Sequence, residues 1–99
     1  MSRHVAHKDL QLCAQVQEAL YWVLGSTVGD ETLAQLQVVA VEPLPDATRL
    51  LVTLTAPADM SLEDAMMRLQ EATKAVRAEV ASAIHRRKAP ELAFRVVRG

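Results

Sequence analysis

Three side chains near the start of the chain are of types that bind transition metals. His4 and His7 are three residues apart, and Cys13 follows six residues later. Imidazole nitrogens and thiolates are zinc ligands, but a structural zinc site needs about four ligands at close spacing. The sequence contains no second pair of such residues, so we expect no metal site and no other cofactor.

Cys13 is also the only thiol that could act as a nucleophile. It lies between Leu12 and Ala14 at the edge of the apolar face of a predicted helix, so we expect a small buried hydrophobic side chain. No serine lies in a nucleophile elbow, and no glycine-rich loop is present to hold a phosphate. We therefore predict that the chain is not an enzyme and takes no small-molecule substrate. A lone cysteine cannot form an internal disulfide, which favours a reducing cytoplasm.

Basic side chains are concentrated in the last third of the chain. Residues 68–99 contain eight lysines and arginines against three acidic residues, whereas the rest contains three against nine. At 100° per residue, Lys74, Arg77, His85 and Lys88 fall within a helical sector of about 80°, with Ala81 on the same face. Basic clusters supply the sequence-independent part of nucleic-acid affinity. The other interpretation is a charged helix face that is simply solvated.

The elements that must position these residues follow from hydrophobic periodicity. Apolar residues at helical spacing predict a first helix over 8–25. Two short segments rich in β-branched residues, 36–41 and 49–55, predict an antiparallel hairpin. A long apolar stripe predicts helix from residue 62 to about 87, and the period changes to that of a strand after Pro90.

The predicted long helix is much longer than the strands against which it would pack. A straight helix over 62–87 would measure roughly 38 Å, whereas a six-residue strand spans about 20 Å. We therefore expect the helix either to bend around Ala72-Thr73-Lys74 or to project its basic end, and both outcomes present residues 74–88 outward. The predicted fold class is α+β with the order α-β-β-α-α-β, a three-stranded sheet with helices packed on one face.

Length and composition set the broad class. The 99 residues are 51% hydrophobic and 23% charged, which predicts one globular domain over 1–99. No run of about 18 apolar residues exists to cross a membrane. The basic residues at the start of the chain are not followed by an apolar run, so we expect no signal peptide there.

Several segments of the sequence resemble the ribosome-binding factor A family, which has a type II KH-like fold. Asp30-Glu31-Thr32-Leu33 stands where the family usually has Asp-Pro-Arg-Leu. Further similarity lies in Val41-Glu42, in Val52-Thr53-Leu54, in Leu69-Gln70-Glu71-Ala72 followed by Arg77, and in Pro90-Glu91-Leu92. Together these segments cover nearly the whole chain.

The resemblance implies non-catalytic binding to the small ribosomal subunit and its rRNA during late maturation and rRNA processing. The family has an Ala-x-Gly kink where this chain has Ala72-Thr73-Lys74. Lysine propagates a helix whereas glycine eases a break, so we predict a weaker kink here.

We expect a cytoplasmic monomer that binds rRNA and has no membrane or small-molecule partner. The expected RNA contacts are Lys74, Arg77, His85, Arg86, Arg87 and Lys88, with Arg3 and Lys8 as further candidates. The alternative is a divergent KH-like protein-interaction module, or a binder of another RNA. Such a module would dock through a strand edge or through the region of Met66 and Met67.

Overall fold

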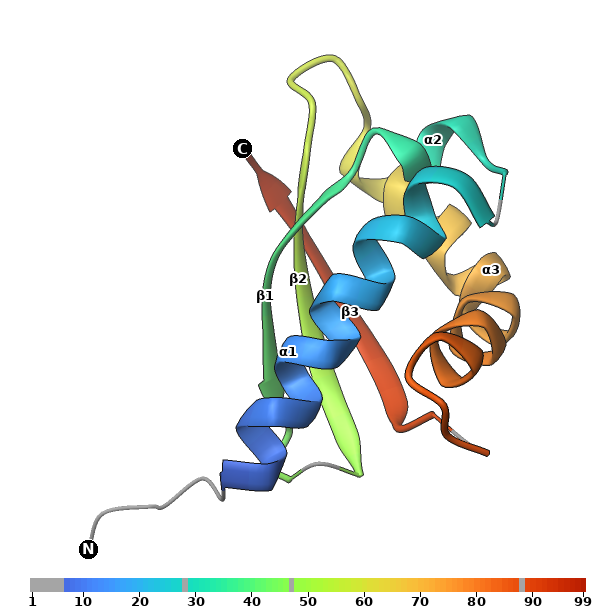
Figure 1. The fold of residues 1–99 in the computed structure, drawn as a ribbon. Helices are drawn as coiled ribbons and strands as arrows, with labels where there is room; N and C mark the ends of the chain where they lie inside the picture. Colours follow the sequence, from blue (N-terminus) through green and yellow to red (C-terminus); the bar gives the residue numbers. More distant parts are fainter. Residues whose placement is uncertain (1–6, 28, 47, 88) are drawn as a thin grey trace, which may run out of the picture.

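A computed structural model describes residues 7–27, 29–46, 48–87 and 89–99, with the backbone alone at 7, 8, 26 and 27. Three helical elements come first in this part of the chain, followed by two strands, a long helix and a last strand (Figure 1). In order they are α1 (His7–Trp22), the π-helical turn η1 (Val23–Thr27), α2 (Glu31–Ala34), β1 (Gln37–Pro43), β2 (Arg49–Ala56), α3 (Leu62–Ala83) and β3 (Glu91–Arg98).

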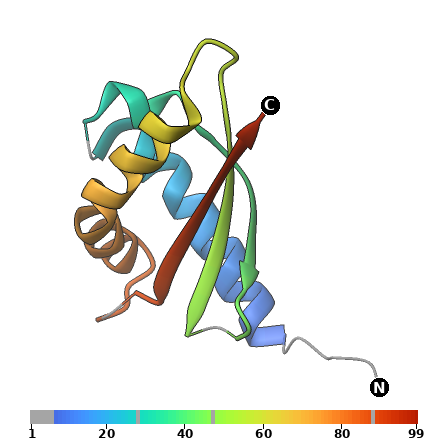
Figure 2. The ribbon, with the colours of Figure 1, turned by 180° about the vertical axis from the view of Figure 1, so that it is seen from behind.

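The three strands form one mixed sheet in the order β1-β2-β3. β1 and β2 are the predicted antiparallel hairpin, and β3 returns after α3 to pair in parallel with β2. Figure 1 shows α1 and α3 lying across the same face of the sheet, and Figure 2 shows the strands in front when the molecule is seen from behind. The predicted α+β class, with helices on one face, is confirmed.

The hydrophobic core lies between this covered face and the two long helices. Leu50, Val52 and Leu54 alternate along β2 and are completely buried, as expected from their spacing. On the helical side, Val16 and Leu20 of α1 meet this surface. The α3 residues that are completely buried in the same core are Ala65, Leu69, Val76 and Val80. Among the described residues no helix covers the opposite face of the sheet, so the completely buried apolar side chains of this part of the chain lie on the helix-covered side.

Helix α3 differs from its predicted form. We expected helix from residue 62 to about 87, as two segments, as one helix bent around Ala72-Thr73-Lys74, or as one with a projecting basic end. α3 is one continuous helix that ends at Ala83. The hydroxyl of Thr73 donates a 2.8 Å hydrogen bond to the Leu69 carbonyl oxygen, four residues back, so it stays within the helical pattern. Lys74, a good helix former, continues the helix where the family resemblance placed a glycine.

Two other elements begin or end at different residues from those predicted. The first helix was expected over 8–25, and α1 instead gives way after Trp22 to the η1 turn that contains Gly25. The first strand is shifted towards the C-terminus of the chain by one or two residues and contains a β-bulge between Val38 and Ala40. In the described part of the chain, no helix is long and apolar enough to cross a membrane.

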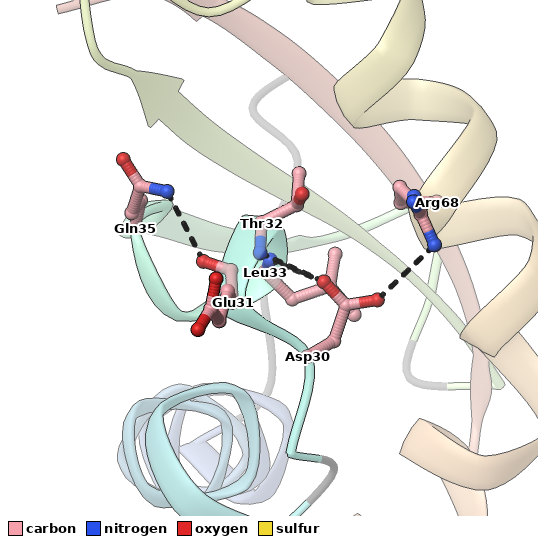
Figure 3. A network of polar contacts seen from close by, with 6 residues as sticks. All are labelled: Asp30, Glu31, Thr32, Leu33, Gln35 and Arg68. Atoms are coloured by element: carbon pink, nitrogen blue, oxygen red, sulfur yellow. Dashed lines mark hydrogen bonds and ion pairs between the residues drawn. The ribbon is translucent and has the colours of Figure 1, made fainter.

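The short helix α2 was not predicted, and Asp30 explains why it forms. The Asp30 carboxylate accepts hydrogen bonds from the backbone amides of Thr32 and Leu33, at 2.8 and 3.1 Å, which caps the helix (Figure 3). Its second oxygen lies 3.8 Å from the Arg68 guanidinium of α3. Leu33 is completely buried. The Asp-x-x-Leu pattern noted in the sequence therefore anchors α2 between the helices.

Candidate nucleic-acid interface

The basic segment begins where α3 ends, at a turn built on His85. The His85 amide donates to the Ser82 carbonyl at 3.2 Å, and the Arg86 amide donates to the Ala81 carbonyl at 2.8 Å. This pair of bonds is the Schellman arrangement that closes many helices. His85 has a positive φ of 58°, the left-handed conformation that glycine usually supplies at this position.

Because of this turn, the predicted basic face does not continue along one helix. Because the helix stops at Ala83, His85 does not continue the sector that contains Lys74 and Arg77. The Schellman turn redirects the chain, and His85, Arg86 and Arg87 are all exposed in the segment beyond it. Lys88 lies outside the described residues.

Arg77 has a different environment from the one predicted. Its Nε and Nη2 atoms donate hydrogen bonds to the carbonyl oxygens of Pro90 and Ala89, at 3.1 and 3.0 Å. Ala81, expected on the same solvent-facing side, is buried. This side of α3 is therefore covered by the chain segment that leads into β3, and the guanidinium fastens that segment to the helix.

Lys74 is exposed on α3, one turn before Arg77. The predicted basic residues that are exposed are therefore Lys74, nine residues before the end of α3, and His85, Arg86 and Arg87 after that end. We call this set the α3-end surface. Arg3 lies outside the described residues, as does the side chain of Lys8.

Two further arginines of the basic third have structural partners that sequence reasoning missed. Arg95 donates from Nη2 to the Thr53 hydroxyl at 3.0 Å across the open face of the sheet. Arg98 donates from Nη1 to three backbone carbonyls of the loop between β2 and α3. The alternation of β3 could have placed Arg95 on the open face, but nothing local to the sequence indicates the contacts of Arg98.

Cys13 is buried in the core, as predicted. Burial, and then the carboxylates of Asp9 and Glu42, raise the pKa of its thiol. A raised pKa leaves the protonated thiol, which is a poor nucleophile and a poor metal ligand. Among the described side chains, no group of three or more histidines, cysteines or carboxylates is arranged to hold a metal ion.

The fold was compared with known proteins. No family model and no curated sequence matches the chain. The crystal structure of ribosome-binding factor A from Thermus thermophilus superposes with a TM-score of 0.74 at 28% identity, over 89% of this chain and 94% of that one. A homology model of Thermus thermophilus ribosome-binding factor A, fitted into a cryo-electron microscopy map of its complex with the 30S subunit, gives a TM-score of 0.67. It is also 28% identical, with 92% of each chain covered. The chain has the fold of ribosome-binding factor A along nearly its whole length, as the sequence resemblance predicted.

Proposed function

We propose that this chain is a ribosome-binding factor A-like protein that binds the small ribosomal subunit and its rRNA during late maturation and rRNA processing. The observation that carries the proposal is the similarity, over nine-tenths of the chain, to a protein fitted into a complex with the 30S subunit. In this proposal the chain acts as a monomer without a cofactor, and holds an RNA conformation without changing a covalent bond.

The α3-end surface is the proposed RNA contact. Arg86 and Arg87 are exposed and adjacent, and the Schellman bonds fix the backbone up to the Arg86 amide. Guanidinium groups bind phosphate oxygens through paired hydrogen bonds, and a fixed turn loses little entropy on binding. Lys74 adds a cation from α3 itself, and His85 contributes its exposed imidazole.

Arg77 has an indirect role in this proposal. Its hydrogen bonds to Ala89 and Pro90 hold the far end of the basic segment against α3. We therefore class it as a positioning residue. Lys88, Arg3 and Lys8 remain further proposed contacts on the basis of the sequence.

The test is co-sedimentation of the purified protein with isolated small subunits at low and at moderate salt. Neutralising phosphates releases counterions, so we expect affinity to fall steeply as salt rises. The charge reversal Arg86→Glu/Arg87→Glu should reduce binding at low salt at least tenfold. The matched control Arg49→Glu/Arg68→Glu makes the same change in net charge at exposed positions outside the α3-end surface and should retain most of the binding.

Three outcomes would overturn the proposal. Equal loss of binding in both double variants would mean that net charge, and not this surface, governs association. Binding that does not respond to salt, or an absence from every ribosomal fraction, would favour the alternative of a protein-interaction module.

A further inference from the structure

A groove lies on the other side of the molecule, between the second half of α1 and the edge strand β1. It has a volume of about 710 Å³. Its walls include Gln17, Glu18, Tyr21 and Trp22 of α1, with Leu36 and Val39 on the side of β1. We call it the α1–β1 groove. Because β1 and β3 are opposite edges of the sheet, the groove is separate from the α3-end surface.

The groove has unusually large exposed apolar side chains on its rim. Tyr21 and Trp22 are 72% and 62% exposed, and they make up two of the three aromatic residues of the chain. Their rings meet edge to face with centroids 5.3 Å apart. Val39, on the opposite rim, is 51% exposed, and Leu20, Leu24 and Leu36 are buried beneath. Tyrosine and tryptophan beside a pocket are the commonest anchors of protein interfaces.

The rim continues along α1 with helical spacing. Leu10, Ala14, Gln17 and Tyr21 are separated by four, three and four residues, so they form one stripe on the helix surface. Leu10, at the far end of the stripe, is also more than half exposed. An elongated stripe of this kind, with Leu10 and Tyr21 at its ends, matches the side chains that a partner helix presents at every third or fourth residue.

The β-bulge in β1 decides between a strand and a helix as the occupant. Val38 pairs with Leu54 and Ala40 pairs with Thr53, so Val39 is the extra residue and points outward. A bulge disrupts the regular hydrogen-bonding edge that an added strand would need. The partner must therefore fill the groove with side chains and cannot simply extend the sheet.

Charge distinguishes a protein partner from RNA. Glu18 lines the groove, and Asp9 and Glu42 lie further along the same side, close enough together that both act on the Cys13 thiol. Residues 9–22 of α1 and the whole of β1 contain no lysine or arginine. A phosphate backbone would be repelled from the groove itself, whereas lysine or arginine would be attracted to it.

We propose that the α1–β1 groove binds an amphipathic helix of another protein, which inserts aliphatic side chains between Tyr21 and Val39 and places lysine or arginine opposite Glu18. This interaction is independent of the RNA contact proposed above. We therefore expect variants that lose peptide binding and retain RNA binding, and the reverse.

Binding to the groove can be measured by the fluorescence of Trp22, because it is the only tryptophan of the chain. The probe is a synthetic 16-residue helical peptide with leucine at every third or fourth position and lysine elsewhere. We expect the emission of Trp22 to shift to shorter wavelength and to saturate at micromolar peptide. Tyr21→Ser/Val39→Ser should weaken this binding at least tenfold, whereas Met67→Ser/Val97→Ser, at exposed apolar positions elsewhere, should leave it unchanged.

The charge requirement has its own pair of variants. Glu18→Lys should weaken binding of the lysine peptide several-fold, whereas Glu71→Lys, on the exposed surface of α3, should have little effect. A peptide with glutamate in place of lysine should bind at least tenfold more weakly. All substituted positions are exposed, and circular dichroism of each variant checks that the fold is intact.

Three results would overturn the proposal. A peptide of the same composition without the leucine stripe could give the same shift, which would show non-specific attraction. A single-stranded RNA could shift Trp22 emission in place of the peptide. Sedimentation could reveal a dimer that Tyr21→Ser dissociates, in which case a second copy of the chain is the occupant.

Discussion

His85 adopts a backbone conformation that residues with a β-carbon rarely adopt, and it does so where the chain must turn. The left-handed region costs an ordinary residue roughly 1–2 kcal/mol, although histidine is among the residues found there more often. The turn nevertheless forms because the Schellman bonds satisfy the carbonyls of Ala81 and Ser82 at the end of α3. His85 therefore lowers the stability of the fold somewhat, and it places an exposed imidazole beside Arg86.

Replacing His85 separates its effect on stability from its effect on RNA binding. We expect His85→Gly to raise the free energy of unfolding by about 1 kcal/mol, because glycine adopts a φ of 58° without strain. His85→Val should lower it, since a β-branched residue is least tolerant of this region. Urea denaturation measures both. If the imidazole contacts RNA, His85→Gly also weakens binding to small subunits while the fold becomes more stable.

At the scale of elements, α3 determines where the basic residues end up. It continues past Thr73 as one helical element that contains Lys74 and Arg77, and its end at Ala83 places the later basic residues in and after a turn. The start of α3 is capped by Ser61, whose hydroxyl accepts a 3.2 Å hydrogen bond from the Asp64 amide, and serine three residues before an acidic residue is a common start of a helix.

Lys74 allows a direct test of why α3 is continuous. We expect Lys74→Gly to lower the free energy of unfolding by about 1 kcal/mol, the usual difference in the interior of an exposed helix. Lys74→Ala, the matched control, should be close to neutral. Urea denaturation and helical circular dichroism measure the two effects. A glycine that costs nothing would indicate that the helix is already strained at this point.

Most of the fold could be predicted from the sequence because alternation and helical spacing are local. Leu50, Val52 and Leu54 identify the buried face of β2, and Pro90 marks the start of β3. The end of α3 could not be predicted in this way, because His85 terminates it without glycine or proline. The partners of Arg77, Arg95 and Arg98 were equally hidden, since they depend on segments that the chain brings together only on folding.

At the scale of the whole molecule, the two charged regions lie at opposite edges of the sheet. The α3-end surface is basic, whereas residues 9–22 of α1 together with β1 carry Asp9, Glu18 and Glu42 and contain no lysine or arginine. Such a division orients an approaching polyanion before contact, because it is attracted to one side and repelled from the other. The small net charge of −1 conceals this arrangement.

Salt titration of RNA binding distinguishes direct contacts from positioning residues. Each phosphate contact that is removed should reduce the slope of log affinity against log salt by about 1. We expect Arg86→Ala and Arg87→Ala each to lower the slope in this way. Arg77→Gln should weaken binding with little change in slope, because its guanidinium bonds to the Ala89 and Pro90 carbonyls. Filter binding to small-subunit RNA over a range of salt concentrations measures the slopes, and an unchanged slope for Arg86→Ala would contradict a direct contact.

The parallel pairing of β2 with β3 has a consequence for how the chain acquires its structure. Arg49 pairs with Glu91 and Ala56 with Arg98, so every pair in this half of the sheet joins residues 42 positions apart. The β1–β2 hairpin closes over a much shorter loop. Because long loops are slower to close, we expect the hairpin to precede β3 during folding. Until then one edge of β2 is unpaired, and aggregation competes most strongly with folding during that interval.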